Sequence, residues 1–211
     1  MNEIEDVRIT RAAYDEVAEL YTDMARPLLG ENPYDRALLG IFAELSDDAA
    51  GPIADVGCGP GRITGYLNSL GHNVFGVDIS PEMLRIARSE YPDLVFELGA
   101  LEELPLADDS LGGLVAWYSI IHTPPERVPA VFDEFARVMR SGAPLLLGFQ
   151  GADTAQGVQE YDHKVALSYR WAPDTLAEVL GGSAFQVQSR FARVARPDER
   201  TPQGALIAIR N

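Results

Sequence analysis

The stretch Ile53-Ala54-Asp55-Val56-Gly57-Cys58-Gly59-Pro60-Gly61 decides the fold of this chain. Its first residues are typical of a short buried strand, and three glycines follow directly. A backbone without Cβ atoms just after a strand allows a ligand to lie against the main chain. Asp78 ends the next apolar run, about twenty residues beyond the first glycine, where a carboxylate is placed to bind a ribose diol. The two features together predict a site for a nucleoside cofactor.

Strands and helices alternate around this stretch. The apolar runs predict five strands, in chain order 53–56, 73–78, 94–98, 111–118 and 144–149. The glycine-rich segment opens a helix that Gly71 ends, and Ser80-Pro81 supplies the N-cap and the first-turn proline of the next helix. This alternation predicts a doubly wound α/β sheet with parallel strands and right-handed crossovers.

Three further helices have their own signals. One is expected over 10–24 with Thr10 as its N-cap, and a second over 34–45. Thr123-Pro124-Pro125-Glu126 has the capping-box pattern and predicts the start of a third helix, which Ser141-Gly142 ends.

The C-terminal part has a different pattern. Residues 151–171 are rich in loop-forming residues, and a helix is expected over 173–180. Two strand-like runs follow, 185–194 and 204–209, with no room for a helix between them. They must therefore pair antiparallel.

Composition and charge exclude several classes of protein. The chain has 211 residues, 46% of them hydrophobic, which is enough for one well-buried domain. Its 17 basic and 32 acidic residues give a net charge of −15, which repels nucleic acid. Four arginines, Arg190, Arg193, Arg196 and Arg200, are interspersed with acids and are interpreted as the solvated side of a sheet.

The sequence also predicts a cytoplasmic protein. Cys58 is the single cysteine, so no internal disulfide can form, and a reducing compartment fits best. Residues 1–10 resemble neither a signal peptide nor a transit peptide, and no run approaches the roughly 18 apolar residues of a membrane span. The three histidines have no metal-ligand spacing, so no metal site is expected.

The glycines do not follow the dinucleotide pattern. A Gly-x-Gly-x-x-Gly site needs its third glycine where this chain has Arg62. A nicotinamide-dependent oxidoreductase is therefore the weaker interpretation.

The wider order of motifs resembles the class I S-adenosylmethionine-dependent methyltransferases, in the branch that acts mostly on small molecules. The resemblance covers residues 50–150. It depends on 55–61, on the acid at Asp78, and on Gly99-Ala100-Leu101-Glu102-Glu103-Leu104-Pro105-Leu106 before Asp108-Asp109-Ser110. It implies a Rossmann-like, mostly parallel seven-stranded sheet with an antiparallel C-terminal strand. It also implies a single domain with an N-terminal helical lid over 1–48, a cofactor-binding core over 49–150, and a substrate-side insertion with a C-terminal hairpin over 151–211.

The resemblance assigns the cofactor residues by position. Gly57, Cys58 and Gly59 are expected against the methionine part of the cofactor, with Asp55 orienting its ammonium group. Asp78 is expected to accept the ribose hydroxyls. The remaining candidates are Tyr21, Arg62, Ile79, Ala100, Leu101 and Trp117.

Several of these assignments have a structural alternative. Arg62 fits a surface helix residue equally well, and Asp78 also fits an ordinary helix-entry acid. Ile79 and Leu101, expected to sandwich the adenine, also suit plain core packing. Many relatives have an acid at the position of Ala100, so either Glu102 or backbone groups replace it, or apolar contact alone holds the adenine.

Two residues are candidates for catalysis. His122 follows the fourth strand, at the sheet edge where ligands bind, and is a candidate base for a hydroxyl or an amine. Its alternative role is a hydrogen bond to the following helix terminus. Tyr14 and Tyr21 share one face of the first helix, where the family often has a lid; Tyr14 is expected to reach the acceptor and Tyr21 the cofactor carboxylate. Core packing is the alternative for both tyrosines.

The sequence therefore predicts S-adenosylmethionine-dependent methyl transfer to an O or N atom of a small molecule, by a monomer or homodimer with no nucleic acid or membrane partner. The competing hypothesis from another class is a protein that binds the cofactor without methyl transfer, as a pericyclase-like or regulatory module.

Overall fold

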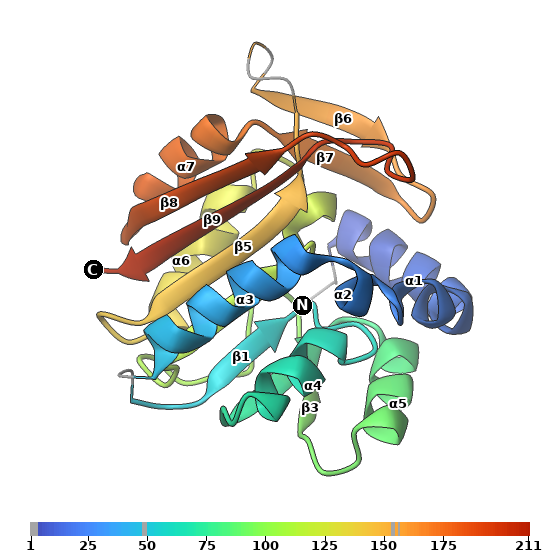
Figure 1. Ribbon diagram of the computed structural model, residues 1–211, viewed down its shortest axis with the longest axis horizontal. Helices are drawn as coiled ribbons and strands as arrows, with labels where there is room; N and C mark the ends of the chain where they lie inside the picture. Colours follow the sequence, from blue (N-terminus) through green and yellow to red (C-terminus); the bar gives the residue numbers. More distant parts are fainter. Residues whose placement is uncertain (1–3, 48–49, 153–154, 156) are drawn as a thin grey trace.

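A seven-stranded sheet with helices on both faces runs through the protein, as the computed structural model shows for residues 4–47, 50–152, 155 and 157–211 (Figure 1). Its strand order is β3-β2-β1-β4-β5-β9-β8. The strands are β1 Ile53–Val56, β2 Val74–Asp78, β3 Phe96–Leu98, β4 Gly113–Trp117, β5 Pro144–Gln150, β8 Phe185–Arg193 and β9 Gln203–Arg210. The first five are parallel, and β9 is antiparallel to both β5 and β8. The predicted fold class and the antiparallel ending are confirmed.

Apolar side chains on the two sheet faces form two cores. The helices are α1 Glu5–Ala25, α2 Leu28–Glu31, α3 Pro33–Ser46, α4 Arg62–Ser69, α5 Pro81–Glu90, α6 Val128–Val138 and α7 Pro173–Gly181, with a 3-10 turn, η1, at Ile120–His122. One core joins the sheet to α6 and α7, and the other joins it to α3 and α4. Because β4 and β5 lie between both cores, every residue of β4 is buried.

The helix starts predicted from the sequence were wrong for α1 and α6. Thr10 is not an N-cap, because α1 begins at Glu5, and Glu5 and Asp6 place negative charge at its positive end. The capping-box prediction at Thr123 is also wrong. The Arg127 amide donates to the Pro124 carbonyl at 2.9 Å, so a turn precedes α6, whose first residue is Val128.

Two further expectations were wrong in the second half of the chain. The helix α6 ends at Val138, before Ser141-Gly142, because Met139 is extended and pairs with Leu111. The stretch 151–171 is more than loop: β6 Val158–Asp162 and β7 Leu167–Trp171 form a separate antiparallel hairpin.

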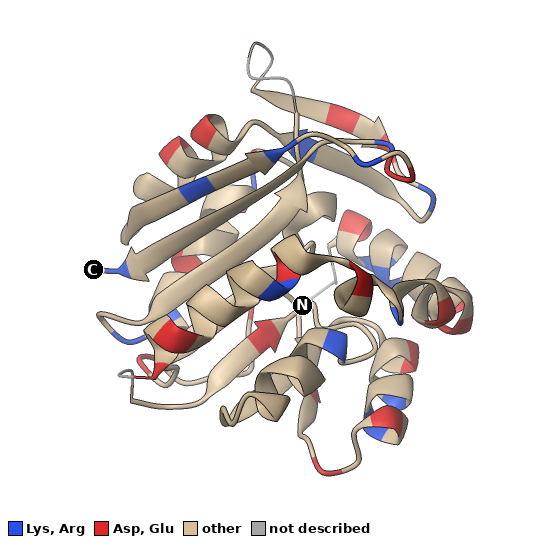
Figure 2. Cartoon of the chain, viewed as in Figure 1, with Lys and Arg blue, Asp and Glu red and all other residues tan. Residues whose placement is uncertain are grey.

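Charged residues are spread over the helices, strands and loops (Figure 2). Within the described residues, no helix combines the length and the apolar character needed to cross a membrane.

Gly204 on β9 packs so closely against Phe149 that a larger residue does not fit, and this can be tested. A Cβ on Gly204 would lie 2.4 Å from the Phe149 ring, whereas one on Gly40 of α3 would meet no atom within 4 Å. We expect Gly204→Ala to lower the free energy of unfolding by about 1–3 kcal/mol through overpacking. Gly40→Ala, the control, should raise it by about 0.5–1 kcal/mol because alanine favours the helix. Urea unfolding of both variants measures this, and equal effects would contradict the packing described here.

Candidate functional site

A cavity lies at the carboxyl ends of β1, β2 and β4, where α1 covers them. Counted out to its open mouth, the space between its walls measures about 600 Å³. Figure 1 shows α1 beyond the tip of β1. The cavity is lined by Thr10, Tyr14, Tyr21, Gly57, Gly59, Asp78, Ile79, Met83, Gly99, Leu101, Trp117, Tyr118, Ser119 and His122.

The glycine-rich turn after β1 brings the backbone close to the end of β4. Gly57 and Gly59 have φ of 72° and 54°. A Cβ on Gly57 would lie 2.2 Å from the Ser119 Cβ, so no larger residue fits there, while the space above Gly59 is open to the cavity. The Gly57 and Cys58 amides donate to the Val77 carbonyl at 2.7 and 3.1 Å. Because these two amides already have acceptors, what the turn offers a ligand is space and not these N–H donors.

Cys58 contributes no side chain to the main cavity. Its thiol is buried against Leu84, Ala87 and Phe96, and burial raises its pKa well above the usual value. Cys58 can therefore contact a ligand through its backbone, or in a second, smaller cavity that it also lines.

Asp78 is a buried carboxylate with remaining acceptor capacity. One of its oxygens accepts from the Gly59 amide at 2.7 Å and the other from the Ser80 amide at 2.8 Å. A carboxylate oxygen can accept two hydrogen bonds, so both oxygens can also receive ligand hydroxyls. Burial raises the pKa of Asp78, and the backbone bonds oppose this shift. Asp78 is thus more than a helix-entry acid.

A smaller cavity of about 330 Å³ adjoins the turn and contains unpaired polar atoms. Among the described residues, Asp55 Oδ1, Arg62 Nη1 and Trp117 Nε1 are buried without a hydrogen-bond partner. The other Asp55 oxygen accepts from the Thr64 hydroxyl at 2.7 Å, and burial raises the pKa of Asp55 to about 6. Buried polar groups are normally satisfied, so a carboxylate, a guanidinium and an indole N–H left unpaired together indicate a ligand with both an amino and a carboxylate group.

Arg62 is therefore not a surface residue. Its guanidinium lies in this smaller cavity, together with Tyr21 and the glycine turn. The sequence left this choice open, because position 62 alone does not say which face of α4 is covered.

The other end of the site is apolar. Ile79 and Leu101 line the main cavity, and Ala100 lines an adjoining cavity of about 410 Å³ with them. Glu102 also lies there, but its carboxylate is bound by Arg127 through two hydrogen bonds of 2.7 and 2.6 Å. Both carboxylate oxygens of Glu102 are thus already engaged by Arg127.

Polar contacts hold α1 over the cavity. The Asp15 carboxylate accepts from the Ser80 hydroxyl at 2.6 Å, and Arg127 bridges Asp6 of α1 to Glu102. Tyr14 and Tyr21 pack edge to face, with ring centroids 5.6 Å apart, and both line the cavity. The two tyrosines therefore combine core packing with a position at the site.

The structure joins the two catalytic candidates. The Tyr14 hydroxyl lies 3.0 Å from His122 Nε2, and His122 Nδ1 lies 2.7 Å from the Leu167 carbonyl oxygen. Because a carbonyl only accepts, Nδ1 carries the proton and Nε2 accepts from Tyr14. His122 thus bonds β7 rather than the terminus of α6, and burial lowers its pKa to about 4.

Sequence reasoning did not single out Ser119 or Tyr118, which both line the cavity. Ser119 lines the cavity, and its hydroxyl is buried without a partner among the described residues. Tyr118 has a φ of 60°, rare for a non-glycine residue, and its hydroxyl donates to Gln203 at 2.7 Å. No sequence pattern signals either property, because both follow from how β4 meets the turn after β1.

Part of the chain is similar to known methyltransferases. Residues 53–142 match a family model described as a methyltransferase domain. The demethylmenaquinone methyltransferase of Chlorobaculum parvum is 33% identical over 136 residues, covering 63% of this chain and 56% of that protein. The malonyl-[acyl-carrier protein] O-methyltransferase of Serratia marcescens is 28% identical, covering 70% and 52%. The chain spans about half the length of the curated relatives it matches.

Solved structures show the same fold. The 1,6-didemethyltoxoflavin-N1-methyltransferase of Burkholderia thailandensis has a TM-score of 0.76 at 20% identity, covering 100% of this chain and 93% of that one. The magnesium protoporphyrin IX methyltransferase of Synechocystis has a TM-score of 0.71 at 19% identity, with 100% of both chains covered.

The His122 tautomer can be tested directly. We expect nitrogen NMR of the imidazole to show a protonated Nδ1 and an unprotonated Nε2, with no titration between about pH 7 and pH 5, because burial disfavours the charged ring. In the urea-unfolded chain, the control, His122 should titrate near its ordinary value of about 6.5. A folded ring that titrates near that value, or that carries its proton on Nε2, would contradict the assigned hydrogen bonds.

Proposed function

Because residues 53–142 match a methyltransferase domain, we propose that this protein is a class I S-adenosylmethionine-dependent methyltransferase that transfers a methyl group from S-adenosylmethionine to an O or N atom of a small organic molecule. The observation that carries the proposal is the group of unpaired polar atoms on Asp55, Arg62 and Trp117. They adjoin a cavity that also contains the buried carboxylate of Asp78.

The residues present fit the cofactor. Asp55 would hold its ammonium group and Arg62 its carboxylate, because each offers the opposite charge from an unpaired buried atom. Asp78 would accept the ribose hydroxyls through its remaining lone pairs. Ile79 and Leu101 would hold the adenine by apolar contact.

The protein's own task is to align the acceptor and to move its proton. S-adenosylmethionine supplies an electrophilic methyl group on a positively charged sulfur. The transfer is an in-line displacement, so much of the catalysis comes from holding the acceptor in position. A base is needed only when the acceptor arrives protonated. The Tyr14–His122 pair suits that case, since the Tyr14 oxygen can take the acceptor proton while its own proton passes to His122 Nε2.

In this proposal, three parts of the chain have different roles. Residues 1–48 act as a lid, 49–150 bind the cofactor, and 151–211 face the acceptor, within a single domain. Residues 1–3, 48–49, 153–154 and 156 of these parts lie outside the described structure. We further propose a cytoplasmic monomer or homodimer that binds no nucleic acid, which the net charge of −15 supports.

The test is methyl transfer itself. The protein is incubated with S-adenosylmethionine and a library of small hydroxyl- and amine-bearing acceptors, and mass spectrometry detects the gain of one CH₂ group. We expect a methylated product with the wild type. His122→Ala should lower turnover about 10²-fold or more, the usual contribution of acid–base catalysis, with little change in cofactor affinity.

Two controls give the result its meaning. Tyr14→Phe removes the hydroxyl and keeps the ring, so it should lower turnover in the same way as His122→Ala. Cofactor binding without any product across the library would support the competing role as a binding module. Unchanged turnover in both variants would remove the Tyr14–His122 pair from the mechanism.

A further inference from the structure

Basic side chains lie near His163, whose ring packs against that of His122. Lys164 and Arg170 belong to the β6–β7 hairpin, and Arg200 belongs to the loop between β8 and β9. Figure 2 shows basic residues on both elements, although the protein as a whole is strongly acidic. Residues 157–203 contain six basic and six acidic residues, so the net charge of −15 lies in the rest of the chain.

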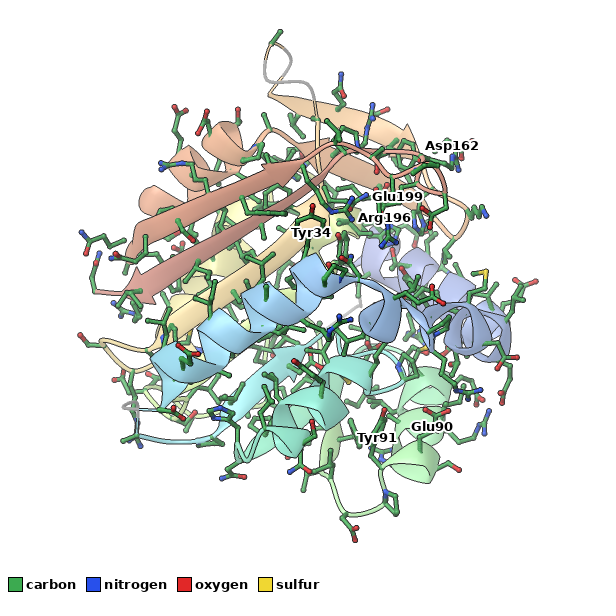
Figure 3. All side chains as sticks on the ribbon, viewed as in Figure 1. Tyr34, Glu90, Tyr91, Asp162, Arg196 and Glu199 are labelled. Carbon is green, nitrogen blue, oxygen red and sulfur yellow. The ribbon has the colours of Figure 1, made fainter. Side chains whose placement is uncertain are left out.

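In the part of the chain that the structure describes, these three side chains differ from the neighbouring arginines in having no counter-ion. Arg190 pairs with Asp174 at 3.3 Å, and the Arg193 and Glu199 side chains form a close ion pair. Figure 3 labels Glu199 beside Arg196, with which it also pairs. Within the described residues, Lys164, Arg170 and Arg200 form no ion pair, so their charge is available to a ligand.

Tyr161 holds two of these cations close together. The Arg170 Cζ lies 5.1 Å from the centre of the Tyr161 ring, and the Arg200 Cζ lies 5.0 Å from it. Arg170 is further oriented by a hydrogen bond of 2.9 Å to the Gln159 side chain. Cation–π contacts attract each guanidinium to the ring but leave both positive charges uncompensated.

His163 connects this group to the catalytic candidates. Its ring centre lies 5.3 Å from that of His122. His163 Nδ1 accepts from the Val165 amide at 3.3 Å, so Nε2 carries the proton, and within the described structure this N–H has no partner. Burial and the charges of Arg200 and Lys164 lower the pKa of His163.

We propose that Arg170, Arg200 and His163 bind a carboxylate on the methyl acceptor, which makes the acceptor an organic acid held by its anionic end while its nucleophilic atom reaches the Tyr14–His122 pair. This inference rests on the proposed function, because it concerns the acceptor of that same site. Arginine is the side chain best suited to binding a carboxylate. The aromatic rings of Tyr14, His122 and Trp117 around the cavity favour an acid with an aromatic body.

Sodium benzoate is the probe, and uncharged benzamide is its neutral counterpart of the same shape. NMR of the His163 ring follows both titrations in protein saturated with S-adenosylhomocysteine. We expect benzoate to shift the His163 signals saturably, to raise the pKa of His163, and to bind at least about 10-fold more tightly than benzamide, since only benzoate carries the charge.

Arg200→Met should weaken benzoate binding about 5- to 10-fold and leave benzamide binding unchanged. Arg200 is exposed, so this variant is expected to fold. Arg190→Met is the matched control, because Arg190 already has a counter-ion, and it should bind benzoate as the wild type does.

Three results would overturn the proposal: no saturable binding of benzoate, equal affinity for benzoate and benzamide, or equal losses in Arg200→Met and Arg190→Met. The affinity for S-adenosylhomocysteine is measured by calorimetry on the same samples. If the wild type does not bind S-adenosylhomocysteine, the proposed function itself is contradicted. If it binds S-adenosylhomocysteine but does not prefer benzoate to benzamide, only the carboxylate site is contradicted.

Discussion

The turn after β1 passes so close to the end of β4 that position 57 has no room for a side chain, and the rest of the site depends on this approach. The turn is fixed on its other side by β2, because the Gly59 amide donates to Asp78 and the Gly57 amide donates to Val77. Three strand ends are thus joined by short contacts. The space above Gly59 stays open. The unpaired buried atoms of Asp55 and Arg62 indicate a ligand that carries both an amino and a carboxylate group.

The position of α1 depends on the same strand ends. Ser80 caps α5 just after Asp78, and its hydroxyl also donates to Asp15 of α1. This contact places Tyr14 where its hydroxyl meets His122, which the Leu167 carbonyl holds in a single tautomer. The Tyr14–His122 hydrogen bond therefore depends on α1, the turn after β4 and the β6–β7 hairpin.

The sequence was informative where local pattern and tertiary structure agree. The strand at 53–56 and the N-cap at Ser80 were predicted correctly, because an apolar run and a capping serine act locally. The start of α1 was misplaced because Arg127, distant in the sequence, binds Asp6 in its first turn. The β6–β7 hairpin was missed because its strands carry polar residues on both faces and pair only with each other. The pairing of Tyr14 with His122 was likewise invisible, although both residues had been placed at the site separately.

Binding of S-adenosylmethionine in this cavity is tested most directly by calorimetry with its demethylated product. We expect S-adenosylhomocysteine to bind with a stoichiometry of one per chain and NADH to give no binding heat. Asp78→Asn should weaken binding about 10-fold or more, because a carboxylate accepts hydroxyl donors better than an amide. Binding of NADH without S-adenosylhomocysteine, or an unchanged affinity in Asp78→Asn, would contradict binding of S-adenosylmethionine in this cavity.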